Sequence, residues 1–406
     1  MVAIEKFPLV GSSDHLERMN SALYKVIRLS LIIGCGVLFV LFALSNLLYF
    51  LKSLSSGNIW SNDFFGLWSY AKFLLLKPFS EIYDNAILLE FQMDLGTCPR
   101  CMLPYAYPPF FLFYILPLAI FSYYLAFLFW TSVNILLYFI VSYDKQQRRY
   151  SAFLAIFAPA TITCLANGQT GLLSSALIVG GFRLVTSRPI LSGILFGLAS
   201  FKPQLGILIP IALVSARLWR TVAAACVTIF VLVVASGVAF GWSMWPLWAA
   251  KLLPHADWVL GITDRYNPTI TSNLTSIGVD LRVARSIQAC VAVVVAAIIW
   301  ICFRRGVTIL ATASVLVGTF LATPYAIVND MPMLTNAVLA VLRDRGHTDR
   351  ALTIAELIVL ALSLTLPVIM VSTWRPAMLR SIPLILLFGL IVWRHFRFRN
   401  HAPKSF

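Results

Sequence analysis

Long runs of apolar residues, separated by short polar stretches, fill almost the whole chain. A helix needs roughly 20 predominantly apolar residues to cross a bilayer, and many of these runs reach or approach that length. We therefore predict membrane segments over residues 29–51, 107–142, 150–166, 170–186, 189–201, 203–216, 221–241, 283–303, 307–322, 331–342, 351–373 and 382–396. The second run is too long for one ordinary span, and its sequence indicates two helices broken near Pro117.

Several of the predicted segments are too short for an ordinary span. The pairs 189–201/203–216 and 307–322/331–342 are short and are interrupted by proline, glycine or polar residues. Interrupted segments are tolerated at membrane depth where they line a cavity inside the protein. We expect these two pairs to form parts of the wall of a crevice.

The composition leads to the same class of protein. Of the 406 residues, 60% are hydrophobic and 12% are charged, and the mean hydropathy is +0.87. A soluble domain carries about 25% charged residues. The chain is too apolar to hide its hydrophobic surface in one aqueous core, so we predict an all-α, polytopic integral membrane protein of about 10–12 membrane helices, several of them short or re-entrant.

The formal net charge of +15 comes from small basic clusters between the apolar runs. Short basic loops stay in the cytoplasm by the positive-inside rule, so this charge predicts a topology, and we expect no nucleic-acid partner. We expect a cytoplasmic N-terminal segment over 1–28, one multi-span membrane domain over 29–396 and a basic cytoplasmic tail over 397–406. Both termini would then be cytoplasmic, and the run 29–51 would be an uncleaved anchor.

The opposite, extracytoplasmic face receives the polar loops. The largest is the external loop 52–106, which we expect to carry interfacial helices, and the turns "ANGQTG", "FKPQ" and "TPYAIVNDMP" reach the same face. The internal loops are short and mostly basic. We therefore expect the functional site to face the periplasm or exterior.

Asp63, in "SNDFFGLW", is the first candidate site residue. An acid that is flanked by aromatic side chains near a membrane surface loses solvation, which raises its pKa and makes it a better general base. An aspartate at this position is also suited to begin an interfacial helix as its N-cap. The two roles are compatible.

Lys202, in "FKPQ", and Asp330, in "IVNDMPM", are the next candidates. A lysine at membrane depth needs a partner, and a lipid phosphate or an acid such as Asp330 would serve; a snorkelling surface lysine is the alternative. Asp330 is equally suited to a capping role. Gln204, or a bound ligand, would satisfy backbone groups that Pro203 leaves free.

Neutral polar residues and two further cations complete the candidate set. Asn167 and Gln169 form either a plain helix–helix turn or a hydrogen-bonding platform for sugar hydroxyls. Tyr107 precedes two prolines that open an apolar helix. Arg265 in "TDRYNP" and Arg375 in "WRPAM" are candidates for binding phosphate.

Motifs of soluble enzymes and of metal sites are missing from the chain. It contains no Walker A loop, HExxH, GxSxG or GxGxxG motif, and its five histidines do not cluster. Cys98 and Cys101, in "TCPRC", allow a local disulfide in an oxidising compartment or, alternatively, a redox-active pair. We therefore expect no cofactor and no histidine-based metal site.

Five stretches of the chain, in the right order, resemble the bacterial glycosyltransferase family 87, once called domain of unknown function 2029. They are "NDFFGLWSYAKFLL", "YAYPPFFLFYILPLAIF", "ANGQTGLLSSALI", "RPILSGILFGLASFKPQLGILIPIALV" and "ATPYAIVNDMPML", within residues 55–345. The resemblance implies the multi-helix GT-C fold. It also implies a polyprenyl-phosphate-mannose-dependent glycosyltransferase that works at the extracytoplasmic face with inversion.

The resemblance also assigns roles to residues and partners. It places the catalytic acid in the first external loop, where Asp63 stands, and Asp63 would take the proton of the acceptor hydroxyl. Lys202, Arg265 or Arg375 would stabilise the charge that grows on the leaving polyprenyl phosphate. The implied partners are a polyprenyl-phosphate sugar donor, with mannose favoured, an envelope glycolipid or glycan acceptor, and the lipid of a bacterial plasma membrane.

The late motif departs from the family, since Asn329 precedes Asp330 where relatives often carry an aromatic residue. A membrane transporter or flippase for a lipid-linked or polar substrate is the alternative function, because it too uses broken helices and intramembrane polar residues. Transporters commonly contain repeated halves. The loop 52–106 has no counterpart of like composition, which favours the enzyme.

Overall fold

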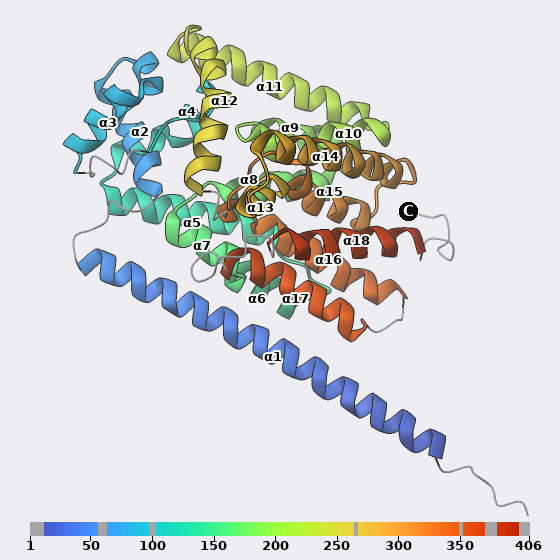
Figure 1. Cartoon of the computed structure of the whole chain (residues 1–406). Helices are drawn as coiled ribbons and strands as arrows, with labels where there is room; N and C mark the ends of the chain where they lie inside the picture. Colours follow the sequence, from blue (N-terminus) through green and yellow to red (C-terminus); the bar gives the residue numbers. More distant parts are fainter. Residues whose placement is uncertain are drawn as a thin grey trace, which may run out of the picture.

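The computed structural model describes residues 12–55, 63–96, 103–263, 267–348, 352–369 and 380–397. Over these ranges the regular structure is entirely helical, without a strand (Figure 1). The predicted all-α class is confirmed.

Within the described ranges, four helices are long and apolar enough to cross a membrane: α1 (Ser12–Ser55), α5 (Tyr123–Ser142), α11 (Trp219–Phe240) and α14 (Leu281–Arg304). A fifth candidate is the pair α6 (Arg148–Phe157) and α7 (Pro159–Asn167), which meet at 41°. Pro159 breaks this pair because proline lacks an N–H and its ring clashes with the preceding turn. The chain is a multi-pass membrane protein, as its hydropathy predicts.

Shorter helices account for most of the other predicted segments. They are α8 (Gly171–Leu184), α9 (Pro189–Ala199), α10 (Ile209–Ser215), α15 (Ile309–Ala322), α16 (Pro332–Thr348), α17 (Ile354–Ile369) and α18 (Ser381–Arg397). A further short helix, α13 (Ile270–Ser276), lies between predicted segments. The segment predicted over 203–216 is divided into the 3-10 helix η5 (Pro203–Leu205) and α10. α8 and α15 are buried along most of their length, so other helices surround them in the interior.

The break predicted within 107–142 is present. η3 (Pro109–Phe111), α4 (Leu112–Ile115) and η4 (Leu116–Ile120) form one irregular helical stretch that contains Pro117. Phe121 then adopts an extended backbone, with φ −97° and ψ 154°, before α5 begins. This stretch packs against α2 (Phe64–Leu76).

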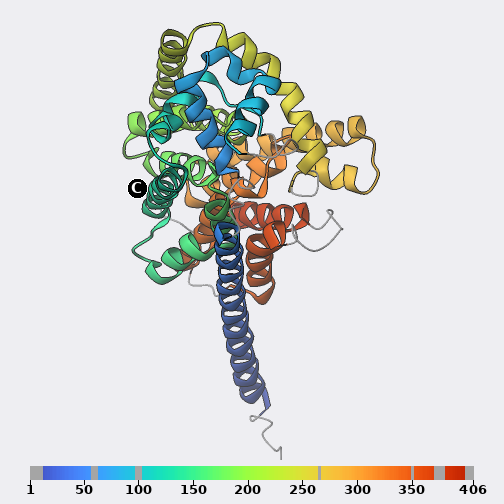
Figure 2. The same cartoon turned by 90° about the vertical axis from the view of Figure 1, so that its left-hand side faces the viewer.

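The first loop after α1 carries α2, η2 (Phe79–Tyr83) and α3 (Asn85–Asp94). These helices gather with α12 (Met244–Thr263) at one end of the bundle, whereas α1 runs along its side and extends beyond it (Figures 1 and 2).

α2 is buried on nearly all sides, so it packs inside the protein and has no broad solvent-exposed face. Phe64, Phe65 and Trp68 lie 5.5, 6.5 and 5.6 Å from the ring of Tyr123 at the start of α5. Such aromatic pairs stabilise a fold beyond their buried area. This cluster anchors the first turn of α2 and with it Asp63, which directly precedes the helix.

Candidate functional site

The turn that links α7 to α8 supplies the floor of the site. Gly168 ends α7 in the left-handed conformation, with φ +61°, which glycine adopts without steric cost. A Cβ at this position would lie 2.5 Å from Cβ of Phe64, so only glycine lets α2 approach this closely. Trp130 Nε1 donates to the Gly168 carbonyl at 3.0 Å and holds the turn in place.

A second turn, η7 (Val328–Asp330), lies against the first one. A Cβ on Gly171, the first residue of α8, would stand 1.6 Å from the carbonyl oxygen of Asn329, so the two backbones meet where a side chain has no room. Asn167 Nδ2 also donates to Asn329 Oδ1 at 3.3 Å. Residues from distant parts of the chain therefore form one rigid platform.

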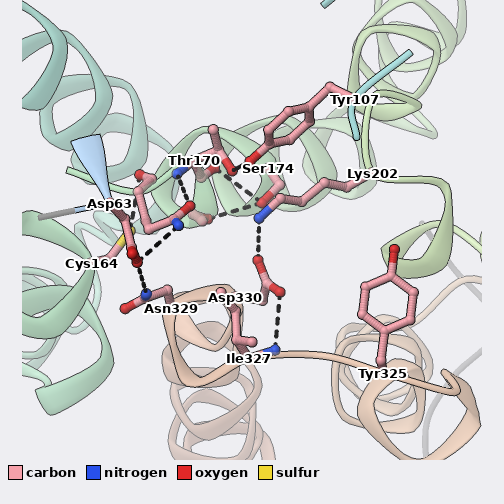
Figure 3. Close-up of polar contacts among 12 residues, drawn as sticks. Asp63, Tyr107, Cys164, Thr170, Ser174, Lys202, Tyr325, Ile327, Asn329 and Asp330 are labelled. Carbon is pink, nitrogen blue, oxygen red and sulfur yellow. Dashed lines mark hydrogen bonds and ion pairs between the residues drawn. The ribbon is translucent and has the colours of Figure 1, made fainter. Parts of the chain in front are cut away.

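Asp63 directs its carboxylate onto this platform. Gln169 Nε2 and Asn329 Nδ2 both donate to Asp63 Oδ2, at 3.0 and 3.3 Å (Figure 3). Asp63 stands at the N-cap position of α2, but its side chain accepts no backbone N–H of that helix. The interpretation of this side chain as a helix cap is therefore wrong.

The surroundings of Asp63 shift the pKa of its carboxyl group upward. Burial raises the pKa of its carboxyl above the ordinary value of 3.8, and the hydrogen bond from Gln169 and the positive charge of Lys202 act against this rise. The residue is only half-buried overall. Because both donors bind Oδ2, Oδ1 is the oxygen left open, and no described residue hydrogen-bonds to it. A carboxylate with a raised pKa and one oxygen free of hydrogen bonds from described residues can accept a proton there.

Lys202 and Asp330 form an ion pair next to Asp63 (Figure 3). Their relative exposures are 6% and 3%, so neither is a snorkelling surface residue. Burial acts to lower the pKa of Lys202, but the charge and hydrogen bond of Asp330, together with Tyr107 and Cys164, more than offset it, and the net pKa is raised. Asp330 Oδ2 also accepts the backbone N–H of Ile327 at 3.3 Å, so the aspartate has both of its expected roles.

Tyr107 closes the site on another side. Its hydroxyl lies 3.4 Å from Thr170 Oγ1, and its ring stacks on Phe111 with centroids 4.1 Å apart. The backbone N–H of Thr170 in turn donates to Gln169 Oε1 at 3.2 Å. The Gln169 amide is therefore held at both ends, by Asp63 and by Thr170.

The structure brings together most of the residues that the sequence singles out. Hydrogen bonds join Asp63, Tyr107, Asn167 and Gln169 through Thr170 and Asn329. The Lys202–Asp330 pair belongs to the same cluster because Asp330 directly follows Asn329 in the chain. Gln204 is half-buried in η5, two residues beyond Lys202, and no described residue hydrogen-bonds to its side chain. Arg265 and Arg375 lie outside the described residues, and so do Cys98 and Cys101.

Two residues of the cluster were not singled out from the sequence as site residues. Asn329 stands out in the sequence only as a departure from the family pattern, and in the structure it donates to Asp63. Thr170 belongs to the quoted turn "ANGQTG" and links Tyr107 to Gln169. Their position beside Asp330 and Gln169 was the available signal. Among the described residues, no group of three or more His, Cys, Asp or Glu side chains could hold a metal ion.

Comparison with known proteins assigns the chain to a family. Residues 105–324, just over half of the chain, match the family model of glycosyltransferase family 87. No curated protein and no solved structure matches the chain. The chain therefore belongs to glycosyltransferase family 87, as the resemblance predicts.

The matched segment includes only part of the cluster. Tyr107, Gln169 and Lys202 lie inside it, whereas Asp63 precedes it and Asp330 follows it. The fold joins these two acids to the matched segment through the hydrogen bonds to Asp63 and through the buried ion pair.

Proposed function

From this family membership we propose that the protein is an inverting glycosyltransferase that takes a sugar, with mannose favoured, from a polyprenyl-phosphate lipid. The acceptor would be an envelope glycolipid or glycan at the extracytoplasmic face of a bacterial plasma membrane. The observation that carries the proposal is the position of Asp63, whose carboxylate lies on the platform beside the Lys202–Asp330 pair. The family assignment favours an enzyme over the alternative of a transporter or flippase.

Asp63 is the proposed general base. Oδ2 is bound by Gln169 and Asn329, so Oδ1 would receive the proton of the acceptor hydroxyl as that oxygen attacks the anomeric carbon. The raised pKa of Asp63 makes the carboxylate a stronger base than an exposed aspartate. Two fixed donors also prevent the carboxylate from rotating, which keeps Oδ1 directed at the acceptor.

Lys202 is the proposed partner of the donor phosphate. When the bond between the anomeric carbon and the phosphate oxygen breaks, its electron pair stays on the phosphate, whose negative charge grows. An ammonium carries three N–H donors, and Asp330 uses one of them, which leaves two for phosphate oxygens. A phosphate that is already anionic leaves without a general acid. Arg265 and Arg375 remain candidates for the same charge.

The neutral groups have different parts in this proposal. The Gln169 amide is held by Asp63 and Thr170, so its main role would be to orient the base. Asn167, Asn329 and Tyr107 would hydrogen-bond sugar hydroxyls, with Tyr107 also supplying an aromatic ring beside the sugar. Gln204 and Asp330 would border the phosphate end of the site.

Analysis of envelope glycolipids tests the proposal. A strain that lacks this protein should accumulate a glycolipid or glycan that is one sugar short, as measured by mass spectrometry. Expression of the wild-type chain should restore the sugar, and the Asp63→Asn chain, expressed at equal level in the membrane, should not. Identical glycolipids in the deletion and wild-type strains would overturn the proposal.

A further inference from the structure

A cavity of about 540 Å³ lies between α1, α6, α16 and α17, away from the platform that holds Asp63. This volume is within the range of ligand pockets, about 300–1,000 Å³. Most of its wall is apolar, with Leu31 and Phe39 of α1 facing Leu154, Val338 and Leu364 of the other helices. A small polar ligand alone would not suit such a wall.

Polar side chains from α1 and from the start of α6 contribute to the cavity wall. Arg28, Gln147 and Tyr150 line it, and the Arg28 side chain is half-buried. A guanidinium carries five N–H donors and a fixed positive charge, which suit an anionic phosphate group.

The protein around these groups is positively charged. Lys25 on α1 and Lys145, Arg148 and Arg149 before and in α6 are exposed. The described acids nearby are already paired: Asp144 with Arg343 at 3.6 Å, and Asp344 and Glu356 with Arg394 at 3.2 and 3.0 Å. The charge that faces a ligand at Arg28 is therefore positive.

The cavity also lies at the membrane surface opposite to Asp63. From Arg28 to Ser55 α1 extends about 40 Å, which is about the thickness of a bilayer with its headgroups. Asp63 follows the far end of this helix. Only 6% of the apolar window of α1 is buried inside the protein, so lipid can reach the cavity along this helix.

We propose that this cavity binds an anionic glycerophospholipid of the leaflet opposite to the site of Asp63. Arg28 binds the phosphate, and an acyl chain fills the apolar part along α1. Basic pockets between membrane helices on the cytoplasmic side are a known means of binding anionic headgroups. The bound lipid joins α1 to α6 and α17, and this site is independent of the proposed sugar transfer.

Native mass spectrometry of the purified full chain tests the proposal, with phosphatidylglycerol and phosphatidylcholine of equal chain length as probes. We expect one tightly bound phosphatidylglycerol and weaker binding of phosphatidylcholine. Arg28→Gln should weaken the binding of phosphatidylglycerol about fivefold. Arg188→Gln, which removes an exposed charge that does not line the cavity, is the matched control and should change it little.

A second pair of variants tests the apolar part. Gly36 lines the cavity, and a Cβ on it meets only Phe153 Cζ, at 4.0 Å, so Gly36→Leu places its side chain in the cavity. Gly34→Leu is the control, because Gly34 has open space around it and does not line the cavity. Gly36→Leu should abolish the bound lipid, and Gly34→Leu should retain it. Equal binding by all four variants, or equal binding of the two lipids, would overturn the proposal. Absence of any bound lipid would also overturn it, since residues 1–11 or a second copy of the chain would then be the occupant of the cavity. Sugar transfer is not measured, so failure here leaves the proposed activity untouched.

Discussion

Asp63 and Asn329, which are 266 residues apart in the chain, share a hydrogen bond of 3.3 Å between Asn329 Nδ2 and Asp63 Oδ2. The bond exists because η7 packs directly on Gly171, at the start of α8, and α2 packs on Gly168. Asn329 is also adjacent to Asp330, the partner of Lys202. The proposed base and the proposed phosphate ligand are thus positioned by one short segment, η7.

Substitution of Gly171 by alanine tests this arrangement. The new Cβ would stand 1.6 Å from the Asn329 carbonyl, so η7 must move away from α8 and the bond to Asp63 must lengthen. A displacement of about 1 Å near a reacting group can reduce turnover about 100-fold, and we expect a loss of that order. Overpacking should also lower the free energy of unfolding by about 1–3 kcal/mol.

Gly389→Ala is the matched control for this variant. Gly389 lies within α18, and a Cβ there meets nothing within 4 Å. The substitution should leave sugar transfer unchanged and raise stability slightly, by about 0.5–1 kcal/mol, because alanine loses less backbone freedom in a helix. Full activity of Gly171→Ala would show that the contact between the two turns is not required.

Variants of the Lys202–Asp330 pair should separate its contribution to stability from its contribution to sugar transfer. Lys202→Met leaves a buried aspartate without its cation, and loss of one partner of a buried pair costs about 3–5 kcal/mol. The double variant Lys202→Met/Asp330→Leu removes both charges and should recover most of this loss. Thermal unfolding in detergent measures the change.

Sugar transfer by the same variants then tests the role of Lys202. The double variant should fold but remain inactive, because no ammonium is left for the donor phosphate. Wild-type turnover by a stable double variant would contradict a phosphate-binding role and leave the pair as a structural feature of the fold.

The pH dependence of transfer follows from the state of Asp63. A general base must be deprotonated, so kcat/KM should rise with pH through the pKa of Asp63 and then level off. Burial raises this pKa above 3.8, so the acidic limb should lie at higher pH than for an exposed aspartate.

Gln169→Met should move this limb further. The hydrogen bond from Gln169 favours the charged carboxylate and lowers the pKa of Asp63, so its removal should shift the limb to higher pH. Rates measured over a pH series with the wild-type and variant proteins check the direction. A limb that stays in place, or moves to lower pH, would show that Asp63 is not the group that titrates.

Much of this architecture could be predicted because lipid imposes it. Apolar length alone identifies spans such as 29–51 and 221–241, since each spanning backbone must satisfy its hydrogen bonds internally. Pro117 marks the predicted break within 107–142, whereas the segment 150–166 is predicted to be continuous and the structure breaks it at Pro159. Asp63 and Lys202 could be selected because a charge near or within a membrane is costly and needs a purpose.

The partners of Asp63 could not be predicted in the same way. Local preference makes an aspartate before "FFGLW" a helix cap, but tertiary contacts turn its carboxylate toward Gln169 and Asn329. Those contacts depend on the close approach of two backbones at Gly171, and glycine is compatible with many conformations. Likewise, the burial of α2 under Tyr123 depends on aromatic packing between helices that hydropathy does not resolve.

The most direct measurement is the turnover of Asp63→Asn, with sugar transfer from a defined polyprenyl-phosphate sugar followed in membranes that contain equal amounts of folded protein. Asparagine keeps the size of the side chain but cannot accept the proton, so transfer should fall by about 10²–10⁴-fold. Asp84→Asn is the control: Asp84 lies in the same loop and caps α3 through Ala86 N and Ile87 N, a role that asparagine also fills. Asp84→Asn should retain wild-type turnover. Equal turnover of the Asp63→Asn and wild-type proteins would contradict the account.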